Sequence, residues 1–467
     1  MGNIITINPV TRIEGHAKVT VELGDDGRVS AALLHVMEFR GFERFVQGMH
    51  VEKMPTVTSR ICGTCPHAHH LVAAKAVDAV FGVEIPPAAR LLRELLNAGS
   101  IIHSHAIHFF ALAGPDLFMG IDAAPEKRNL VALLGVAPEV GKAALRLRSI
   151  GQRIAEEVGG RGTHPVTCVV GGMASGISAD TRALLLKMAE EAVTIAQTVI
   201  AAGRGALTNN DSLLRSFTQP LHDLATVNNG ALDCYDGAIR IRDPEGKTLR
   251  EFKSTEYREV MLEEALPHTY AKQVLLRTSA SETKPYRVGP LARLNNVDTI
   301  DTPLAAAEWK VFRELWGAPC HLTGAQHHAR LVEMLHHAEK AVQILKNEEI
   351  LSGNIRTRGR GTPRRGIAHV EAPRGILIHD FDVDANANVT AANLLVATQH
   401  NIAAINESVK LAADKFLSAS DTTLTNGVEF AIRCWDPCLS CSTHAVGQMP
   451  LELTISHQGT TLRRIVR

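Results

Sequence analysis

The order of hydrophobic and polar residues predicts a chain that starts with strands and continues with helices. Apolar side chains alternate along residues 4–36, and Asp25-Asp26-Gly27 interrupts them with a turn signal. From about Thr56 the pattern becomes helical, with apolar residues at helical spacing over 88–113 and an Ala/Val-rich stretch over 71–81. We therefore expect an N-terminal β-hairpin that is followed by helices.

The rest of the chain alternates between helical segments and short strand pairs. Ser178 and Asp180 are candidate N-caps of a helix that continues to about Ala202. The remaining expectations are a hairpin over 233–251 with its turn at 243–246, a helix over 325–346, a loop over 352–369, strands over 370–390 and a helix over 391–418. Because no repeat or linker divides the chain, the pattern favours one interlocked, α-rich α+β unit.

Composition and charge exclude several classes of protein. The 467 residues include 49 Lys+Arg and 49 Asp+Glu, and this zero net charge argues against nucleic-acid binding. No apolar run approaches the roughly 20 residues that span a bilayer, and the N-terminus lacks a secretory signal pattern. We expect a cytoplasmic protein without membrane insertion. In that compartment cysteines serve as ligands, nucleophiles or buried thiols.

Two CxxC pairs lie near opposite ends of the chain, Cys62/Cys65 and Cys438/Cys441. Four thiolates favour soft or borderline metals such as Zn, Ni, Cu(I) or clustered iron. The usual zinc signature has its pairs about 15–20 residues apart, and this one does not. The spacing alone leaves open a structural zinc site, a catalytic metal site and two unrelated thiol pairs. We expect the isolated cysteines to be buried thiols: Cys168, Cys234, Cys320 and Cys434.

The residues around these pairs make the pattern more specific. The first pair lies in Arg60-Ile-Cys-Gly-Thr-Cys-Pro-His-Ala-His69, and the second in Asp436-Pro-Cys-Leu-Ser-Cys-Ser-Thr-His444. Four further segments complete an ordered set: NPVTRIEGH at 8–16, RGFE at 40–43, EAPRG at 371–375 and NLLVAT at 393–398. With these six motifs in this order, the chain resembles the large subunits of [NiFe]-hydrogenases, and the resemblance extends from residue 8 to residue 450.

The resemblance implies a fold and a metal centre. The fold would be α+β and predominantly helical, with a central bundle of long helices, small peripheral sheets and the N-terminal hairpin. Cys62 and Cys438 would be terminal nickel ligands, while Cys65 and Cys441 would bridge nickel and an iron that carries CO and two cyanides. The enzyme would cleave H₂ heterolytically and reversibly to two protons and two electrons.

The resemblance also assigns roles to residues around that centre. Arg374 would lie over the open metal position, Glu14 would carry the proton that Cys438 receives, and Thr398 would hydrogen-bond a cyanide. His69 would orient a cysteine ligand, with Pro373, Asp436 and Arg60 also near the site. Glu43, the carbonyl of Leu394 and His444 would bind Mg²⁺, or Fe²⁺ in its place.

The family pattern further implies processing and partners. A maturation protease would cut after His444, so that residues 1–444 form a single interlocked domain and 445–467 are removed. Since the remaining cysteines are isolated and form no cluster for iron–sulfur ligation, electrons would leave through a small subunit with one or more [4Fe–4S] clusters. Further subunits would be heterodisulfide reductase or a flavin/NAD(P) module, and VEAPRGILIHDF favours the first slightly.

Other classes are weighed against this interpretation. The quinone-site subunit of respiratory complex I shares the fold but lacks the four cysteines. A structural zinc subunit that serves only in interactions would leave Arg374, Glu14 and Glu43 unexplained. A regulatory hydrogen sensor without turnover remains open on sequence alone.

Overall fold

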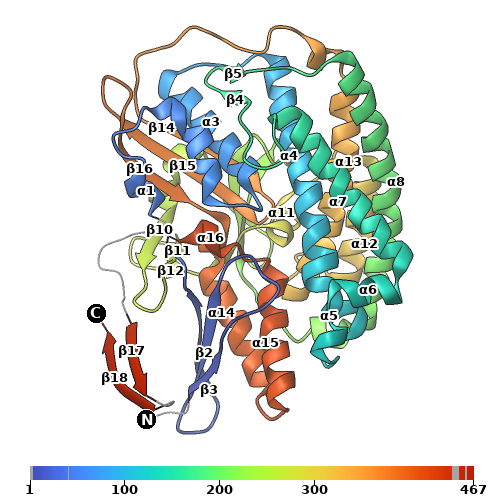
Figure 1. The fold of residues 1–467 in the computed structure, drawn as a ribbon, viewed down its shortest axis with the longest axis vertical. Coiled ribbons are helices and arrows are strands. Elements are labelled where there is room, and N and C mark those ends of the chain that lie inside the picture. The colour runs from blue at the N-terminus through green and yellow to red at the C-terminus, as the bar shows by residue number, and fades with distance from the viewer. Residues whose placement is uncertain (1–3, 40, 444–451, 458–459, 467) are drawn as a thin grey trace.

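The computed structural model describes residues 4–39, 41–443, 452–457 and 460–466. Long helices dominate one side of the molecule (Figure 1): α4 (Pro87–Ile107), α7 (Pro138–Gly159), α8 (Ala179–Asn209) and α13 (Gln326–Lys346) pack side by side. At the α4–α7 crossing, a Cβ on Gly151 would lie 2.6 Å from the backbone nitrogen of His103. Glycine therefore lets these two helices approach more closely than any other residue would.

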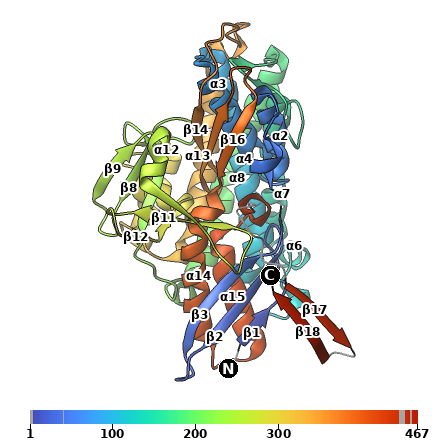
Figure 2. The same cartoon turned by 90° about the vertical axis from the view of Figure 1, so that its left-hand side faces the viewer.

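A second layer joins the two ends of the chain. Strands β1 (Ile4–Ile7), β2 (Ala17–Leu23) and β3 (Val29–Val36) form an antiparallel sheet in that order. Helix α14 (Ala397–Phe416) packs on β3 and on α15 (Asp421–Trp435), so the start and the end of the sequence lie together (Figure 2).

A second three-stranded sheet carries the EAPRG segment. Strands β14 (Gly366–Ala372), β15 (Gly375–Val383) and β16 (Val389–Leu395) are antiparallel, and α3 (Pro66–Phe81) packs against β14 and β15. The β14–β15 turn consists of Pro373 and Arg374. Gly375 follows at φ 131°, where a Cβ would lie 2.4 Å from Val288 Cγ2, so this turn requires glycine.

Two further sheets flank this layer. One has the order β13–β6–β8–β9 with β7 paired to β6, and the other has the order β10–β11–β12. Their strands are β6 (His222–Asn228), β7 (Ala231–Leu232), β8 (Ala238–Arg242), β9 (Thr248–Phe252), β10 (Met261–Ala265), β11 (Lys272–Arg277), β12 (Thr283–Lys284) and β13 (Tyr286–Arg287).

The remaining helices and strands complete the fold. The helices are α1 (Phe42–Phe45), α2 (Met54–Thr58), α5 (Gly114–Met119), α6 (Leu130–Val136), α9 (Asp211–Leu214), α10 (Tyr257–Val260), α11 (Pro290–Asn296), α12 (Pro303–Trp316) and α16 (Leu439–Ser442). The strands are β4 (Cys168–Val169), β5 (Gly172–Met173), β17 (Glu452–His457) and β18 (Thr460–Val466). No helix in the described ranges is long and apolar enough to cross a membrane.

Most expected elements are present, and the α+β class is confirmed. The 233–251 hairpin, the helix over 325–346 and the cap at Ser178 agree with the structure, although α8 continues to Asn209 rather than Ala202. Two expectations were wrong. Residues 366–369 begin β14 instead of ending a loop, and 391–395 belong to β16 because they pair with β15.

Candidate metal centre

The fold brings the two CxxC pairs together. Cys62 and Cys65 directly precede α3, and Cys65 is the N-cap of that helix, while Cys438 and Cys441 lie at α16. All four are buried, and their Sγ atoms lie within 4.8 Å of one another. The predicted four-thiolate cluster is therefore present in the geometry.

The sulfur atoms form two close pairs across the loops. Sγ of Cys62 is 3.2 Å from that of Cys438, and Sγ of Cys65 is 3.3 Å from that of Cys441. Burial raises the pKa of the Cys438 and Cys441 thiols well above the usual value. Four thiolates this close repel one another, so a cation is needed to hold all of them ionised. The donor set and its burial fit a thiophilic metal.

Neighbouring groups fix the orientation of the cysteines. The backbone nitrogens of Thr64 and Cys65 each donate to Cys62 Sγ at 3.3 Å. Nε2 of His69 lies 3.4 Å from Cys441 Sγ, within hydrogen-bond reach of that thiol. The hydroxyl of Thr398 accepts a hydrogen bond from the Cys438 nitrogen at 2.9 Å, which leaves its own hydrogen available to another acceptor.

Arg374 lies beside the cluster and is buried. Its Nε donates to the Asp436 carbonyl at 2.7 Å, and its Nη2 donates to Asp436 Oδ1 at 2.9 Å. Burial opposes the charge, but Asp436 and the cysteines raise the pKa of Arg374 well above its usual value. Nη1 has no hydrogen-bond partner among the described residues. The fixed cation therefore keeps one donor nitrogen for a ligand.

Sequence reasoning missed the network that shapes the Arg374 turn. Buried Arg293 pairs with Glu333 at 2.5 Å and with Glu371 at 2.8 Å. It also donates to the carbonyls of Ala372 and Pro373, both at 3.1 Å. These bonds hold the backbone directly before Arg374. Single charged residues on separate elements carry no local pattern that would have revealed this network.

Glu14 is placed next to the second cysteine loop. Its carbonyl accepts from the Leu439 nitrogen at 3.1 Å, and its segment forms a parallel bridge with Cys438. Its Oε2 accepts from the Ser440 nitrogen at 3.0 Å, and its Oε1 accepts from the Ser440 hydroxyl. The carboxylate therefore lies at the loop that contains Cys438 and Cys441.

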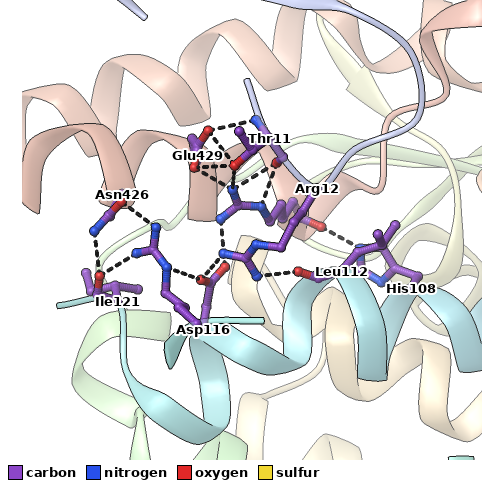
Figure 3. A network of polar contacts seen from close by, with 10 residues as sticks. Thr11, Arg12, His108, Leu112, Asp116, Ile121, Asn426 and Glu429 are labelled. Carbon is purple, nitrogen blue, oxygen red and sulfur yellow. Dashed lines mark hydrogen bonds and ion pairs between the residues drawn. The ribbon is translucent and has the colours of Figure 1, made fainter. Parts of the chain in front are cut away.

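A buried network of ion pairs and hydrogen bonds joins the segment of Thr11 and Arg12 to α15 (Figure 3). Nη1 of Arg433 pairs with Asp116 at 2.8 Å, and its Nε donates to the Thr11 carbonyl at 3.0 Å. Arg12 and Arg128 also pair with Asp116, while Thr11 donates to Glu429. The motif that contains Glu14 is thus fastened to α15, the helix that leads into Cys438.

Part of the predicted magnesium site is described. Glu43 Oε1 accepts from the Leu394 nitrogen at 2.9 Å, so these two residues are adjacent; His444 lies outside the described residues. Nζ of Lys272 lies 3.3 Å from Glu43, 3.0 Å from Glu263 and 3.5 Å from Asn393 Oδ1. No sequence motif indicates this cluster of oxygen atoms around Lys272.

The remaining site residues have different surroundings. Pro373 is buried in the Arg374 turn, whereas Arg60 is exposed and its guanidinium forms no hydrogen bond or ion pair with the described cysteine thiols. The four isolated cysteines are buried free thiols, as expected. A small cavity adjoins the cluster; it is lined by Cys65, His69, Ala372, Arg374, Leu377, Val396, Ala397, Thr398, Cys438 and Cys441.

Comparison with known proteins agrees with this geometry. Residues 40–134 match the family described as nickel-dependent hydrogenase, and residues 4–39 match the HoxL-like family. The chain is 38% identical over 460 residues to one of the subunits of the vhc F420-non-reducing hydrogenase of Methanococcus voltae, covering 97% of each chain. It is 35% identical over 479 residues to the beta subunit of the NAD-reducing hydrogenase HoxS of Cupriavidus necator, again covering 97% of each.

Solved structures give the same result. The crystal structure of an NAD⁺-reducing [NiFe]-hydrogenase in the H₂-reduced state matches with a TM-score of 0.91 and 38% identity, covering 95% of this chain and 99% of that one. The [NiFeSe]-hydrogenase of Desulfovibrio vulgaris Hildenborough, at 23% identity and a TM-score of 0.77, shares the fold.

The chain belongs to the nickel-dependent hydrogenase family and is a large, catalytic subunit of a [NiFe]-hydrogenase. It is therefore an oxidoreductase. The alternatives, a hydrogen sensor without turnover or a zinc-binding subunit that serves only in interactions, are not favoured.

Proposed function

We propose that this chain cleaves H₂ reversibly to two protons and two electrons at a Ni–Fe centre held by its four clustered cysteines. The observation that carries the proposal is the position of four buried Sγ atoms within 4.8 Å of one another. Arg374 lines the cavity beside them, and the backbone of Glu14 pairs with that of Cys438. Heterolytic cleavage of H₂ produces a hydride and a proton. Arg374 would stabilise the developing negative charge, and Glu14 would accept the proton.

The metals would divide the cysteines between them. Cys62 and Cys438 would bind nickel, and Cys65 and Cys441 would be shared by nickel and an iron that carries one CO and two cyanides. The cavity that Cys65, Cys438 and Cys441 line supports a place for the diatomic ligands of the iron, because Ala372, Leu377 and Val396 give it apolar walls. When bound, this centre would supply the Lewis acidity and the redox capacity for H₂ cleavage.

The chain's own residues would manage charge and protons. Arg374 lines the cavity at the cluster and would offer Nη1, which has no partner among the described residues, while Asp436 fixes its other nitrogens. Thr398 would donate its hydroxyl hydrogen to an iron-bound cyanide. Glu14 would take the proton from the Cys438 thiol, since its backbone lies beside that cysteine. His69 would hold Cys441 in place.

A divalent ion would stabilise the C-terminal region. Glu43, the carbonyl of Leu394 and His444 would bind Mg²⁺ or Fe²⁺. The oxygen atoms of Glu43, Glu263 and Asn393 around Lys272 support a site for a hard cation. Glu43 and Glu263 raise the pKa of Lys272 against the effect of its burial, which indicates a local excess of negative charge.

Processing would complete the site. Cleavage after His444 would leave residues 1–444 as the mature domain and remove 445–467. Thr443 supports this, because its backbone bridges to Ala271 and so anchors the residue directly before the predicted C-terminus. A maturation protease would make the cut.

Electrons would leave through partner subunits. Among the described residues, the four cysteines of the centre are the only cluster of at least three Cys, His, Asp or Glu side chains that could hold a metal ion. A small subunit with one or more [4Fe–4S] clusters would therefore accept the electrons. Heterodisulfide reductase or a flavin/NAD(P) module would follow, and similarity to F420-non-reducing relatives favours the first slightly. The free, buried cysteines suit a cytoplasmic location.

Metal analysis and a hydrogen assay test this function together. The large subunit of the purified complex is predicted to contain one nickel and at least one iron, and the complex is predicted to reduce a dye under H₂. Stoichiometric zinc and no dye reduction, in a chain that mass spectrometry shows to end at His444, would overturn it.

A further inference from the structure

One hydroxyl group lies between two carboxylates at the edge of the metal centre. Ser440 is 3% exposed and is located between Cys438 and Cys441. Its Oγ donates to Glu14 Oε1 and also lies 3.3 Å from Glu38 Oε2. A serine hydroxyl has a single hydrogen, so it donates to one carboxylate at a time and can accept from the other when that one is protonated.

The hydrogen-bonded series continues outward from Glu38. Its Oε1 lies 2.6 Å from Nδ1 of His16. The Glu38 side chain is 21% exposed and that of His16 is 78% exposed. Exposure therefore rises at each step from the buried serine to an imidazole in solvent.

The backbone fixes this series in place. His16 and Glu38 lie at the end of the β2–β3 pair, where the Met37 nitrogen donates to the His16 carbonyl at 3.2 Å and Ala17 pairs with Val36. Gly15 adopts φ 86°, and a Cβ there would lie 2.8 Å from Leu439 Cβ. Glycine at this position allows the segment to contact α16 closely. The three side chains thus meet because the sheet and the cysteine loop are in direct contact.

We propose that Ser440, Glu38 and His16 form a proton exit from Glu14 to solvent within this chain, which rests on the proposed function. A proton on Glu14 passes to Ser440 Oγ while the serine's own hydrogen passes to Glu38. Glu38 then protonates Nδ1 of His16, and the imidazolium releases a proton to water. The serine hydroxyl turns toward Glu38 before the transfer, and the hydrogen that it receives from Glu14 restores its starting contact. The imidazolium releases its Nε2 proton, and proton exchange with water returns the ring to the tautomer whose Nδ1 accepts, so that one proton leaves per passage.

The alternative is a purely structural role, in which the same contacts only hold the N-terminal sheet against α16. The two roles differ in what glutamine at position 38 does. Glu38→Gln keeps an oxygen that accepts a hydrogen bond, so a purely structural role would be preserved. Proton transfer would be lost, because an amide does not take up and release a proton as a carboxylate does. His16→Gln is a second variant at a solvent-exposed side chain, where misfolding is not expected. Glu22→Gln, an exposed carboxylate on β2 of the same sheet, is the matched control.

The test uses the processed complex with its small subunit. Glu38→Gln and His16→Gln are expected to lower H₂ oxidation about tenfold or more, with a larger solvent isotope effect, because a group that transfers protons is lost. Glu38→Asp is expected to recover part of the rate, and added imidazole to recover part of the rate of His16→Gln. Glu22→Gln should match the unmodified complex.

A second readout is independent of turnover. In rapid-scan infrared spectra after a pH jump without electron acceptor, iron-bound CO and cyanide bands should keep their positions in Glu38→Gln but interconvert more slowly. Unchanged rates in both variants with intact bands would overturn the proton exit alone. The absence of such bands from the unmodified, processed complex would overturn the proposed function and the exit together.

Discussion

Arg374 holds Asp436 through two hydrogen bonds, to its carbonyl at 2.7 Å and to its Oδ1 at 2.9 Å. This contact joins the β14–β15 turn to the residue that lies two positions before Cys438. The guanidinium is therefore fixed relative to the second cysteine loop by that loop's own backbone. Its position depends on three segments that are distant in sequence: the turn, α15 and, through Arg293, α11.

Arg374→Lys tests whether this geometry matters beyond charge. Lysine keeps the positive charge, but its single ammonium nitrogen cannot replace the three nitrogens of the guanidinium. It cannot make both hydrogen bonds to Asp436 and also offer a separate donor to a ligand. We expect H₂ oxidation to fall about 100-fold, the usual effect of removing one preorganised donor. Nickel content should not change. Arg146→Lys, at an exposed ion pair with Glu191, serves as the control. Full activity in Arg374→Lys would exclude the proposed role.

Glu14→Gln tests the proton acceptor. The amide oxygen can still accept from the Ser440 nitrogen, so the loop should keep its position. Because the amide cannot take a proton, we expect turnover to fall about 100-fold. Exchange between D₂ and water protons, followed by mass spectrometry, measures the effect. Glu139→Gln, at an exposed glutamate of α7, should leave exchange unaltered. Normal exchange in Glu14→Gln would show that another group takes the proton.

Asp116→Asn tests the buried network of Figure 3. The substitution leaves Arg433, Arg12 and Arg128 without their shared carboxylate. Removing one partner of a buried ion pair typically costs about 3–5 kcal/mol, and we expect the free energy of unfolding to fall by this amount. Urea unfolding of the large subunit measures it. Asp122→Asn at the nearby surface should change stability by less than about 0.5 kcal/mol. Equal stability of both variants would contradict the role of the network.

Buried histidines predict how stability depends on pH. Burial lowers the pKa of His70, His103, His105 and His336 to about 4, and that of His67, His369 and His400 to about 3. The unfolded chain binds these protons near pH 6.5, so it holds more protons than the folded chain below that pH. The stability from neutral histidines is therefore complete above about pH 6.5, and it is lost as pH falls toward about 4 for the first four residues and toward about 3 for the other three.

The size of this effect is measurable. Each histidine contributes up to about 1.4 kcal/mol per pH unit within that window. The urea midpoint of the large subunit should fall steadily on acidification, and His369→Gln should reduce the slope. A midpoint that is flat between neutrality and about pH 5 would contradict the neutral state of these side chains.

The sequence predicted the centre better than its surroundings. The CxxC pairs, Arg374, Glu14 and His69 lie in compact motifs, and the fold brings these motifs together as expected. Ser440, Glu38 and Arg293 act through contacts between distant segments, and no local spacing marks such contacts. The segment 391–395 was mistaken for helix because Ala391, Ala392 and Leu394-Leu395 favour helices locally. Its pairing with β15 overrides that preference.

An infrared spectrum of the natively expressed complex tests the central claim most directly. The account predicts iron-bound CO and cyanide bands that shift when H₂ replaces argon, in a large subunit that ends at His444. A featureless spectrum from a chain shown to end there would contradict a Ni–Fe centre at Cys62, Cys65, Cys438 and Cys441.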